Sequence, residues 1–565
     1  MPKQLIECVP NFSEGRDMSI IKQITDEIER VDGVKLLDVD PGKATNRTVV
    51  TFVGEPEPVV QAAFLAIKKA AELIDMRQHK GEHPRMGATD VCPLIPISNI
   101  TMEETVEWAH KLGEMAGKEL GIPLYMYESA ARKPERKNLA TIRAGEYEAL
   151  PEKLEKPEWK PDYGPARFNA RAGATAIGAR DFLIAYNVNL NTTSVRRANS
   201  VAFDVREQGR VKREGDSVNG AILRDAKGEP LREPGACKGV KAIGWFIEEY
   251  GVAQISMNIT NVKQTPLHVA FEACRKSANE RGMRVTGSEL VGLAPLQVML
   301  DAGHYFLRQQ QRSLGASEEE VIKIAIKSLG LDELTPFDPK KKIIEYQLRE
   351  DTPTPLLDMN LRAFANETAS ESVAPGGGSI AAYVGALGAA LGTMVANLSS
   401  HRRVWDHRWE EFSQWAEKGQ RLKDALLHLV DEDTRAFNRI IEAVRLPKST
   451  EAEKAAREHA MQEATQYATE VPFQTMELAL QSFELAKAMA TEGNPNSASD
   501  AGVGALCARA AVHGALLNVQ INAKGLKDKA FAEDITEKAE KMGRDADQLE
   551  QEVLEIVRKK VEEQG

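Results

Sequence analysis

The chain changes its secondary-structure pattern once, near residue 357, and this change limits the folds it can adopt. Before that point, short apolar segments typical of strands alternate with segments whose apolar residues recur at helical spacing. After it, the strand-like segments disappear, alanine becomes more frequent, and helical periods continue to the end of the chain. We therefore predict an α+β part followed by a separate all-α domain of about 210 residues.

The α+β part divides into two units of similar element order. The second unit begins near Asp181 and follows the order β-α-β-β-α-β of the ferredoxin-like fold, and the first unit opens in the same way. We predict two ferredoxin-like sandwiches that face each other across a cleft. The expected ranges are 1–180 and 181–348 for these subdomains, 349–356 for a linker, and 357–565 for a helical bundle.

Hydrophobic periodicity and turn residues place the individual elements. The expected strands are 4–12, 34–40, 47–54, 92–98, 123–129, 182–190, 241–251, 252–260 and 284–293. The helices expected before residue 357 are 17–31, 56–74, 102–120, 192–207, 266–282 and 294–307. Those expected after it are 379–398, 408–431, 434–445, 450–468, 472–491, 500–523 and 532–561.

Composition excludes several classes of protein. Lysine and arginine number 73 and aspartate and glutamate 84, so the formal net charge of −11 argues against general nucleic-acid binding. A local basic pocket can still hold an anionic substrate. The five cysteines are scattered and form no CxxC motif, which favours a reducing compartment over a disulfide frame or zinc knuckle. With no apolar run typical of a signal peptide near the N-terminus, we expect a cytoplasmic protein.

One segment, Ala374–Ser400, contains no charged residue and is long enough to cross a membrane. It consists mostly of alanine, glycine and serine, which allow helix backbones to approach closely. We therefore predict a buried helix of a tight bundle and no membrane span. A second charge-poor helix over 501–522 suggests that a dimer buries part of both.

The loop from His79 to Gly87 contains two histidines, His79 and His83, four positions apart. Gly81 and Pro84 argue against a helix here, and no third ligand accompanies the pair, so a metal site is not expected. A histidine between a carboxylate and a guanidinium is able to exchange a proton near neutral pH. The residues alone leave two interpretations open, this acid/base role and a solvated charged loop.

Other loops have the composition of a ligand-binding rim. Asp38 and Asp40 end one expected strand, and Thr45–Thr48 begins the next, which fits either a ligand rim or a turn capped by side chains. Asn11 and Glu14 could form a similar rim. Two further stretches, Gly164–Gly173 and Cys237–Trp245, combine glycines with arginines or lysines that could hold carboxylates.

Two motifs of the helical domain complete the set. Gly376, Gly377 and Gly378 precede the charge-free helix, where free N–H groups favour an anion, although a flexible entry turn is the alternative. The segment Leu429–Phe437 contains Asp431, Glu432 and Asp433. Because residues two apart on a helix point in different directions, we expect one of these aspartates at most to face a pocket, or all three acids to be solvated.

Taken together, these motifs resemble one family closely. The blocks ECVPNFSEGR, TNRTVVTFVGEPE, LIDMRQHKGEHPRMGATDVCP, APGGGS and VDEDTRAF are similar to those of bifunctional formimidoyltransferase-cyclodeaminase, the folate enzyme of histidine breakdown. The resemblance extends over essentially the whole chain. It implies a transferase and a lyase activity on one chain, each with its own active site.

The resemblance implies the chemistry of both sites. The first transfers the formimidoyl group from N-formimidoyl-L-glutamate to tetrahydrofolate, giving 5-formimidoyltetrahydrofolate and L-glutamate. The second deaminates and cyclises this product to 5,10-methenyltetrahydrofolate. Tetrahydrofolate, in polyglutamylated form, would be a co-substrate, and no metal is implied. The family also implies a homo-oligomer, a ring-shaped octamer built from dimers.

The resemblance assigns roles to individual residues. The family's acid/base histidine falls on His83, the catalytic acid of the second site on Asp433, and Asp40 would help to hold or polarise the folate amine. Stretches that contact folate fall on Gly164, Pro165, Ala166, Arg167, Phe168, Asn169, Ala170, Arg171, Ala172, Gly173, Gly235, Lys238, Gly239, Val240, Lys241 and Gly244.

Two other functions compete with this one. The helical domain could instead be a methenyltetrahydrofolate cyclohydrolase fused to the transferase. A non-catalytic folate-binding oligomer is the third hypothesis, and it would leave His83 and Asp433 replaceable. Turnover assays of the pure protein separate the three.

Overall fold

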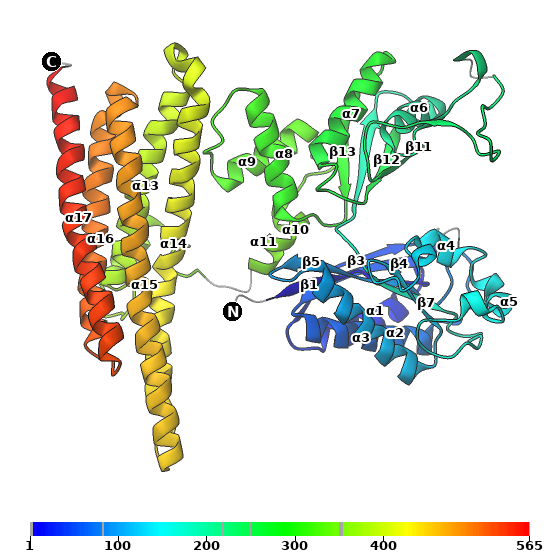
Figure 1. Cartoon of the computed structure of the whole chain (residues 1–565), viewed down its shortest axis with the longest axis horizontal. Coiled ribbons are helices and arrows are strands. Elements are labelled where there is room, and N and C mark those ends of the chain that lie inside the picture. Colours follow the sequence, from blue (N-terminus) through cyan, green and yellow to red (C-terminus); the bar gives the residue numbers. More distant parts are fainter. Residues whose placement is uncertain are drawn as a thin grey trace. The chain divides into compact units, whose positions relative to one another are not determined.

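The computed structural model describes residues 4–43, 45–81, 84–216, 220–248, 250–349 and 354–563. The chain forms two compact units (Figure 1). One comprises Met1–Val298 and Leu329–Gln347, and the other Met299–Ser328 and Leu348–Gly565. An α+β architecture followed by a helical one is confirmed, because every strand in the described part of the chain ends before residue 292.

The first unit contains a seven-stranded mixed sheet. Strand β3 pairs with β4, both β1 and β2 lie between β4 and β5, and β7 joins β5 to β6 in parallel. Pairings among β1 to β5 are all antiparallel. The strands are β1 (Leu5–Cys8), β2 (Asn11–Phe12), β3 (Val34–Gly42), β4 (Arg47–Gly54), β5 (Thr89–Ser98), β6 (Leu124–Glu128) and β7 (Thr175–Ala179).

Three helices cover one face of this sheet, α1 (Met18–Glu29), α2 (Pro56–Leu73) and α3 (Met102–Leu120). Their apolar faces bury the main core of the subdomain against the sheet. Shorter helical turns follow β6, namely η1 (Pro134–Arg136), α4 (Leu139–Arg143), η2 (Tyr147–Ala149), α5 (Leu150–Leu154) and η3 (Pro157–Trp159). With part of the opposite sheet face they enclose a second, smaller core.

Two expectations for this sheet were wrong in detail. The strand expected over 4–12 is interrupted at Val9 and Pro10, because proline has no N–H for the ladder, and the Asn11 side chain bonds the Val9 carbonyl instead (2.9 Å). Strand β7 was not expected. Its sequence, TAIGA, lacks the branched residues typical of strands, and its complete burial between two parallel neighbours explains the small side chains.

The second sheet has four antiparallel strands in the order β11, β12, β8, β13. Helices α6 (Val195–Val205) and α7 (Leu267–Glu280) belong to this subdomain. The polar insert forms a short antiparallel ladder, β9 (Arg210–Val211) with β10 (Arg232–Glu233), and a turn, η4 (Glu214–Asp216). The sheet strands are β8 (Ile184–Leu190), β11 (Val240–Ile247), β12 (Val252–Ile259) and β13 (Val285–Val291).

The other unit is helical. Its five long helices are α13 (Gly377–Ser400), α14 (Trp409–Arg445), α15 (Glu451–Glu492), α16 (Ala498–Ala523) and α17 (Lys529–Glu562). Of the shorter helices that follow β13 along the chain, α10 (Pro339–Lys342) and most of α11 (Ile344–Arg349) belong to the first unit. The others are α8 (Leu296–Gln309), α9 (Glu318–Leu329), α12 (Leu361–Thr368), η5 (Arg403–Arg408) and η6 (Pro495–Ser497). Helices α9 to α12 were not expected, since proline-rich sequence surrounds three of them.

Two pairs of expected helices are single continuous helices, α14 and α15. Helix α15 continues through Pro472, which cannot bond the carbonyl four residues earlier, that of Ala468. The Asn522 side chain on α16 donates to that carbonyl (2.6 Å) and so replaces the missing bond. A contact from the neighbouring helix therefore makes the proline tolerable inside α15.

Helices α13 and α16, the latter with η6, are long and apolar enough to cross a membrane by length and composition alone. Inside the structure, 61% of the apolar window of α13 and 44% of that of α16 are buried. Both pack against other helices through alanine and glycine residues. This close packing is typical of helices in a bundle core.

Candidate functional site

The loop that carries the two histidines is anchored by described residues at both of its ends. The Nε2 of His79 lies 2.8 Å from the Asn46 carbonyl oxygen, and Arg85 Nε donates to His79 Nδ1 (3.2 Å). The Asn46 side chain accepts from the Gly15 N–H (3.0 Å) and donates to the Lys80 carbonyl (3.1 Å). His83 and Glu82 lie outside the described residues.

These contacts settle the protonation of His79. A carbonyl oxygen only accepts, so His79 Nε2 must carry a proton, and a guanidinium only donates, so Nδ1 must be the unprotonated nitrogen. Both ring nitrogens of this buried imidazole are therefore occupied. His79 is therefore not available to exchange protons with a substrate.

One other motif segment, Gly164–Gly173, contacts this loop. The Ala88 N–H donates to the Ala172 carbonyl (2.8 Å) and the Ala174 N–H to the Met86 carbonyl (2.9 Å). Gly173 has a φ of +69°, and a Cβ on it would lie 2.3 Å from the Met86 oxygen, so only glycine fits. The C-terminal end of the Gly164–Gly173 stretch therefore packs directly against the histidine loop.

The rest of that stretch is more exposed. Gly164, Pro165, Ala166 and Arg167 are exposed, and the Phe168 ring packs on Tyr147 with centroids 5.5 Å apart. The Asn169 side chain accepts from the N–H groups of Arg171 and Ala172, and the Ala170 carbonyl accepts from the Tyr147 hydroxyl. Arg171 bonds the Glu72 carbonyl (2.5 Å). The first four residues of the stretch therefore lie at the surface of the protein.

Arg85 is held from its other side by two carboxylates. Its guanidinium contacts Glu146 (2.9 Å) and binds Glu148 with both terminal nitrogens (2.8 and 2.7 Å). Glu146 has a φ of +56°, a strained conformation for a residue with a side chain. The Tyr147 N–H donates to the Arg85 carbonyl (3.0 Å), so segment 143–148 fixes the loop. Neither Glu146 nor Glu148 was predicted from the sequence to be a site residue.

A buried aspartate lies beside the loop. The register of β2 and β5 advances by one residue on β2 and by two on β5, so Asp90 is the extra residue of a β-bulge. Asp90 is fully buried, accepts from the Met86 N–H (3.1 Å), and pairs with Arg143 (2.7 Å) and, more loosely, with Arg47 (3.8 Å). Burial lowers the pKa of Arg47 to about 10, against the opposing effect of Asp90. Asp90, Arg143 and Arg47 thus form a largely buried cluster of charges beside the histidine loop.

The face of the sheet opposite α1–α3 carries the first rim predicted from sequence. Asp40 pairs with Val49, Val49 with Asn11, and Asn11 with Val91, so these residues share one row across four strands. Asp40 is exposed, whereas Asn11 is buried. Asp40 and Asn11 therefore lie on one face of the sheet, two strands apart.

The second stretch predicted to contact folate, Gly235–Gly244, spans the start of β11. Lys241 is exposed, as alternation along the strand requires, and Val240 is buried. Gly244 exchanges two hydrogen bonds with the Asn199 side chain, and a Cβ there would lie 2.3 Å from the Asn199 nitrogen. Gly244 therefore allows α6 to approach the strand. Gly235 closely approaches the Arg206 carbonyl, Gly239 has a φ of +67°, and the Lys238 carbonyl accepts from Thr265.

In the helical unit the structure brings the glycine motif and the acidic motif together. Asp433 on α14 accepts from the N–H (2.9 Å) and the hydroxyl (3.0 Å) of Ser379, in the first turn of α13. A Cβ on Gly378 would lie 2.1 Å from Asp433 Oδ1. Gly376 is the N-cap, and Asn518 lies beside Gly377. The helix N-terminus that was predicted to bind an anion thus binds the Asp433 carboxyl of the same chain.

The three acids of that motif have different partners. Asp431 is buried and accepts from the Leu356 N–H (3.0 Å) and the Leu357 N–H (3.4 Å), so it fixes the entry to the helical domain. Glu432 bonds Tyr467 and Arg435. Burial raises the pKa of Asp433, and the two bonds from Ser379 oppose this. Asp433 is therefore the acid of the three that fits a proton donor.

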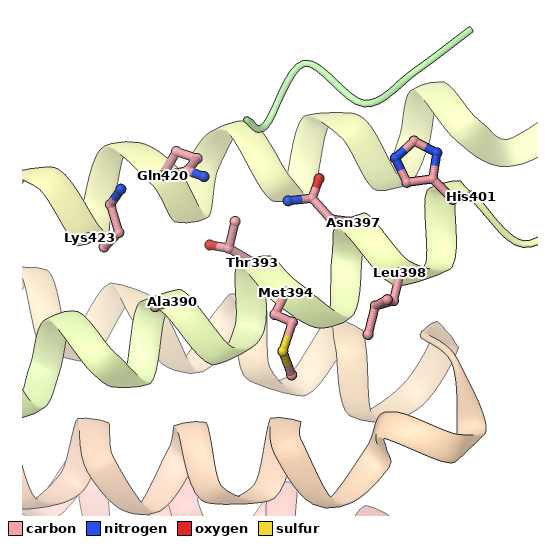
Figure 2. A pocket seen from close by; sticks show the side chains of 8 residues that line it. All are labelled: Ala390, Thr393, Met394, Asn397, Leu398, His401, Gln420 and Lys423. Atoms are coloured by element: carbon pink, nitrogen blue, oxygen red, sulfur yellow. The ribbon is translucent and has the colours of Figure 1, made fainter. Parts of the chain in front are cut away.

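A separate hollow of about 330 Å³ lies between α13 and α14 (Figure 2). Asn397 and Gln420 line it, and both side-chain amides donate to the Gly315 carbonyl (2.9 and 3.0 Å). They hold the α8–α9 loop against the bundle, which explains why Met299–Ser328 belongs to the helical unit. Among the described residues, no group of three or more His, Cys, Asp or Glu side chains could hold a metal ion.

Comparisons with known proteins cover nearly the whole chain. Residues 5–180 match the family model "Formiminotransferase domain, N-terminal subdomain", 185–349 match "Formiminotransferase domain", and 360–541 match "Formiminotransferase-cyclodeaminase". The formimidoyltransferase-cyclodeaminase of Rattus norvegicus is 44% identical over 531 residues, which is 94% of each chain.

Two shorter relatives match the two parts separately. The glutamate formimidoyltransferase of Streptococcus pyogenes is 41% identical over 54% of this chain and 94% of its own length. The methenyltetrahydrofolate cyclohydrolase of Methylorubrum extorquens is 39% identical over 36% of this chain and 97% of its own length. With all three family models matched in order and a full-length relative at this identity, the chain belongs to the formimidoyltransferase-cyclodeaminase family.

Proposed function

We propose that the chain is a bifunctional folate enzyme that transfers a formimidoyl group from N-formimidoyl-L-glutamate to tetrahydrofolate and then deaminates and cyclises the product. The full-length match to a protein named formimidoyltransferase-cyclodeaminase is the observation that carries this proposal. The two anchored sites, one in each unit, agree with two separate reactions. Histidine degradation is the pathway in which this donor arises.

In the transferase site, His83 acts as the acid/base group. The attacking folate amine loses its N5 proton as it bonds the formimidoyl carbon, and the departing glutamate nitrogen gains a proton as its bond to that carbon breaks. One imidazole can carry that proton between the two nitrogens. His79, with both nitrogens engaged, supports this choice. Asp40 holds the folate amine from the sheet face.

The glycine- and cation-rich stretches hold folate. The exposed residues Gly164, Pro165, Ala166 and Arg167 belong to the stretch whose C-terminal end contacts the histidine loop, and Arg171, Lys238 and Lys241 supply cations for the carboxylates of a polyglutamate tail. Gly235, Gly239 and Gly244 shape the second stretch. No metal takes part in this scheme.

In the cyclodeaminase site, Asp433 is the proton donor. When the folate N10 closes on the formimidoyl carbon, ammonia must leave the resulting tetrahedral carbon, and its nitrogen needs a proton. Because Oδ2 accepts both bonds from Ser379, the acid proton belongs on Oδ1. Burial, which raises the pKa of Asp433, keeps more of this carboxyl protonated near neutral pH.

The proposal is tested by mixing the pure protein with formimidoylglutamate and tetrahydrofolate. Release of ammonia together with the absorbance of methenyltetrahydrofolate is the expected result. Formation of neither product would refute the function. Supplying methenyltetrahydrofolate alone tests the cyclohydrolase alternative, which the 39% identity to the Methylorubrum extorquens enzyme favours. Rapid hydrolysis without ammonia release would support that alternative.

Finer features of the proposal concern fold and assembly. Both sheets are versions of the ferredoxin-like fold, which the strand orders β5-β1-β4-β3 and β13-β8-β12-β11 support. The protein is cytoplasmic and forms a homo-oligomer, a ring-shaped octamer built from dimers. Support for an oligomer comes from large apolar side chains exposed on α13 and α16, among them Leu387, Leu398, Leu517 and Ile521.

A further inference from the structure

His79 is a buried histidine to which the proposed reaction gives no role. It lies four positions before His83, and its two ring nitrogens are bonded to parts of the chain from different elements. One partner, Asn46, is in the turn between β3 and β4, and the other, Arg85, is in the histidine loop itself, two positions after His83. His79 therefore links the β3–β4 turn to Arg85, and its ring is shielded from solvent.

Each partner of His79 is itself held firmly. Asn46 is buried, adopts a φ of +49°, and bonds Gly15 and Lys80 through its side chain. A Cβ on Gly81 would lie 2.1 Å from the Thr45 oxygen, so the backbone of the loop is pressed against this turn. The start of the histidine segment therefore has its position set by β3 and β4.

Arg85 fixes the other end of the segment. Its guanidinium donates to His79 while it also binds Glu146 and Glu148, two carboxylates on a separate turn. Arg85 is buried, although Glu148 is largely exposed. The single bond from Arg85 Nε to His79 Nδ1 thus links the two anchored ends of the segment that carries His83.

We propose that His79 is a positioning residue of the transferase site, a neutral clasp between Asn46 and Arg85 that fixes the two ends of the segment carrying His83. This inference rests on the proposed role of His83. A cationic His79 would turn a second N–H toward the Arg85 guanidinium, so the clasp requires the neutral imidazole. A misplacement of about 1 Å in a catalytic group costs on the order of 10²-fold in rate, which sets the size of the expected effect.

The test compares two replacements of His79 in the full chain. His79→Leu removes both bonds, whereas His79→Gln offers an amide oxygen for Arg85 and an amide N–H for Asn46. We expect His79→Leu to lower the transferase kcat by about 10²-fold with little change in either KM, and His79→Gln to restore most of it. A kcat near that of the wild type in His79→Leu, or a loss that appears only in KM, would overturn the inference.

Arg85→Gln removes the donor to His79 Nδ1 and should itself lower the transferase kcat, so the clasp can be tested even if His79→Leu folds poorly. Where His79→Leu folds, the double variant His79→Leu/Arg85→Gln should be no slower than Arg85→Gln alone, because the two side chains act as one clasp. Additive losses would contradict the clasp. The matched control is His110→Leu, which removes another partly buried histidine of the same subdomain, bonded to Tyr163, and should leave transfer unchanged.

Two further measurements distinguish a loss of folding from a loss of transferase function. Cyclodeamination of supplied 5-formimidoyltetrahydrofolate and the midpoint of thermal unfolding should stay at wild-type values in His79→Gln. If the wild-type chain itself shows no formimidoyl transfer, the proposed function fails. If the wild type transfers and His79→Leu is equally fast, only the clasp fails.

Discussion

The two units hold their proposed acid/base groups by different means. Around the His83 segment, the anchors are side chains from separate loops and turns, among them Asn46, His79 and Arg85. Asp433 lies inside a 37-residue helix, and its partner is the first turn of another helix. The first arrangement depends on several side-chain bonds, and the second on close approach of two helix backbones.

This difference predicts different sensitivity to mutation. A network of side-chain bonds distributes the positioning over many residues, so conservative replacements that keep a donor and an acceptor should be tolerated. Contact between helices leaves little free space around Asp433, so one added methyl group acts directly on this proposed catalytic carboxyl. Mutations can therefore show whether the two reactions depend on bonding or on packing.

The largest effects are expected from the proposed acid/base residues themselves. His83→Ala should lower formimidoyl transfer by about 10²–10⁴-fold and leave cyclisation of supplied 5-formimidoyltetrahydrofolate unchanged. Asp433→Asn should do the reverse, because an amide cannot supply the proton. Separate assays of ammonia release and transfer measure both. Loss of both activities in either variant would mean that the two sites are not independent.

A methyl group at Gly378 tests the packing side of the comparison. The new Cβ would lie 2.1 Å from Asp433 Oδ1, so the carboxyl must move, and we expect Gly378→Ala to lower cyclodeamination by about 10–100-fold. Gly376→Ala is the matched control, since no atom lies within 4 Å of a Cβ there and its backbone is extended. Equal losses in the two variants would contradict the packing argument.

Ser379→Ala tests the electrostatics of the same carboxyl. The variant removes the hydroxyl donor that favours the charged carboxylate, so the pKa of Asp433 should rise further. The protonated acid is the active form, so cyclodeamination falls as pH rises through this pKa, and in Ser379→Ala that fall should occur about one pH unit higher. The pH profile of kcat measures the shift. A fall at lower pH than in the wild type would mean that Ser379 does not stabilise the carboxylate.

Sequence reasoning predicted the elements better than their contacts. The boundaries of β4 and α3 agreed with the structure because helix caps and strand alternation are local signals. The proximity of Asp433 to Ser379 could not be predicted, since the residues are 54 positions apart and meet only through the packing of α13 on α14. Likewise, nothing local indicates that Glu146 and Glu148 bind Arg85.

Pattern alone also misled where tertiary contacts replace local ones. Each half of α15 reads as a separate helix because proline normally ends a helix. The structure keeps one helix, since Asn522 satisfies the carbonyl that Pro472 leaves unbonded. Such compensation from a neighbouring helix has no signature in the sequence around the proline.

The smallest expected effect concerns the bond from Asn522 to the Ala468 carbonyl, and both substitutions that test it lie in the helical unit. Asn522→Ala leaves the Ala468 carbonyl without its donor, which should cost about 1–3 kcal/mol of unfolding free energy. Pro472→Ala in the same background restores the backbone donor and should recover most of the loss. Denaturant unfolding measures both, and transferase activity should not change. If Pro472→Ala gives no recovery, Asn522 stabilises the bundle through contacts other than its bond to the Ala468 carbonyl.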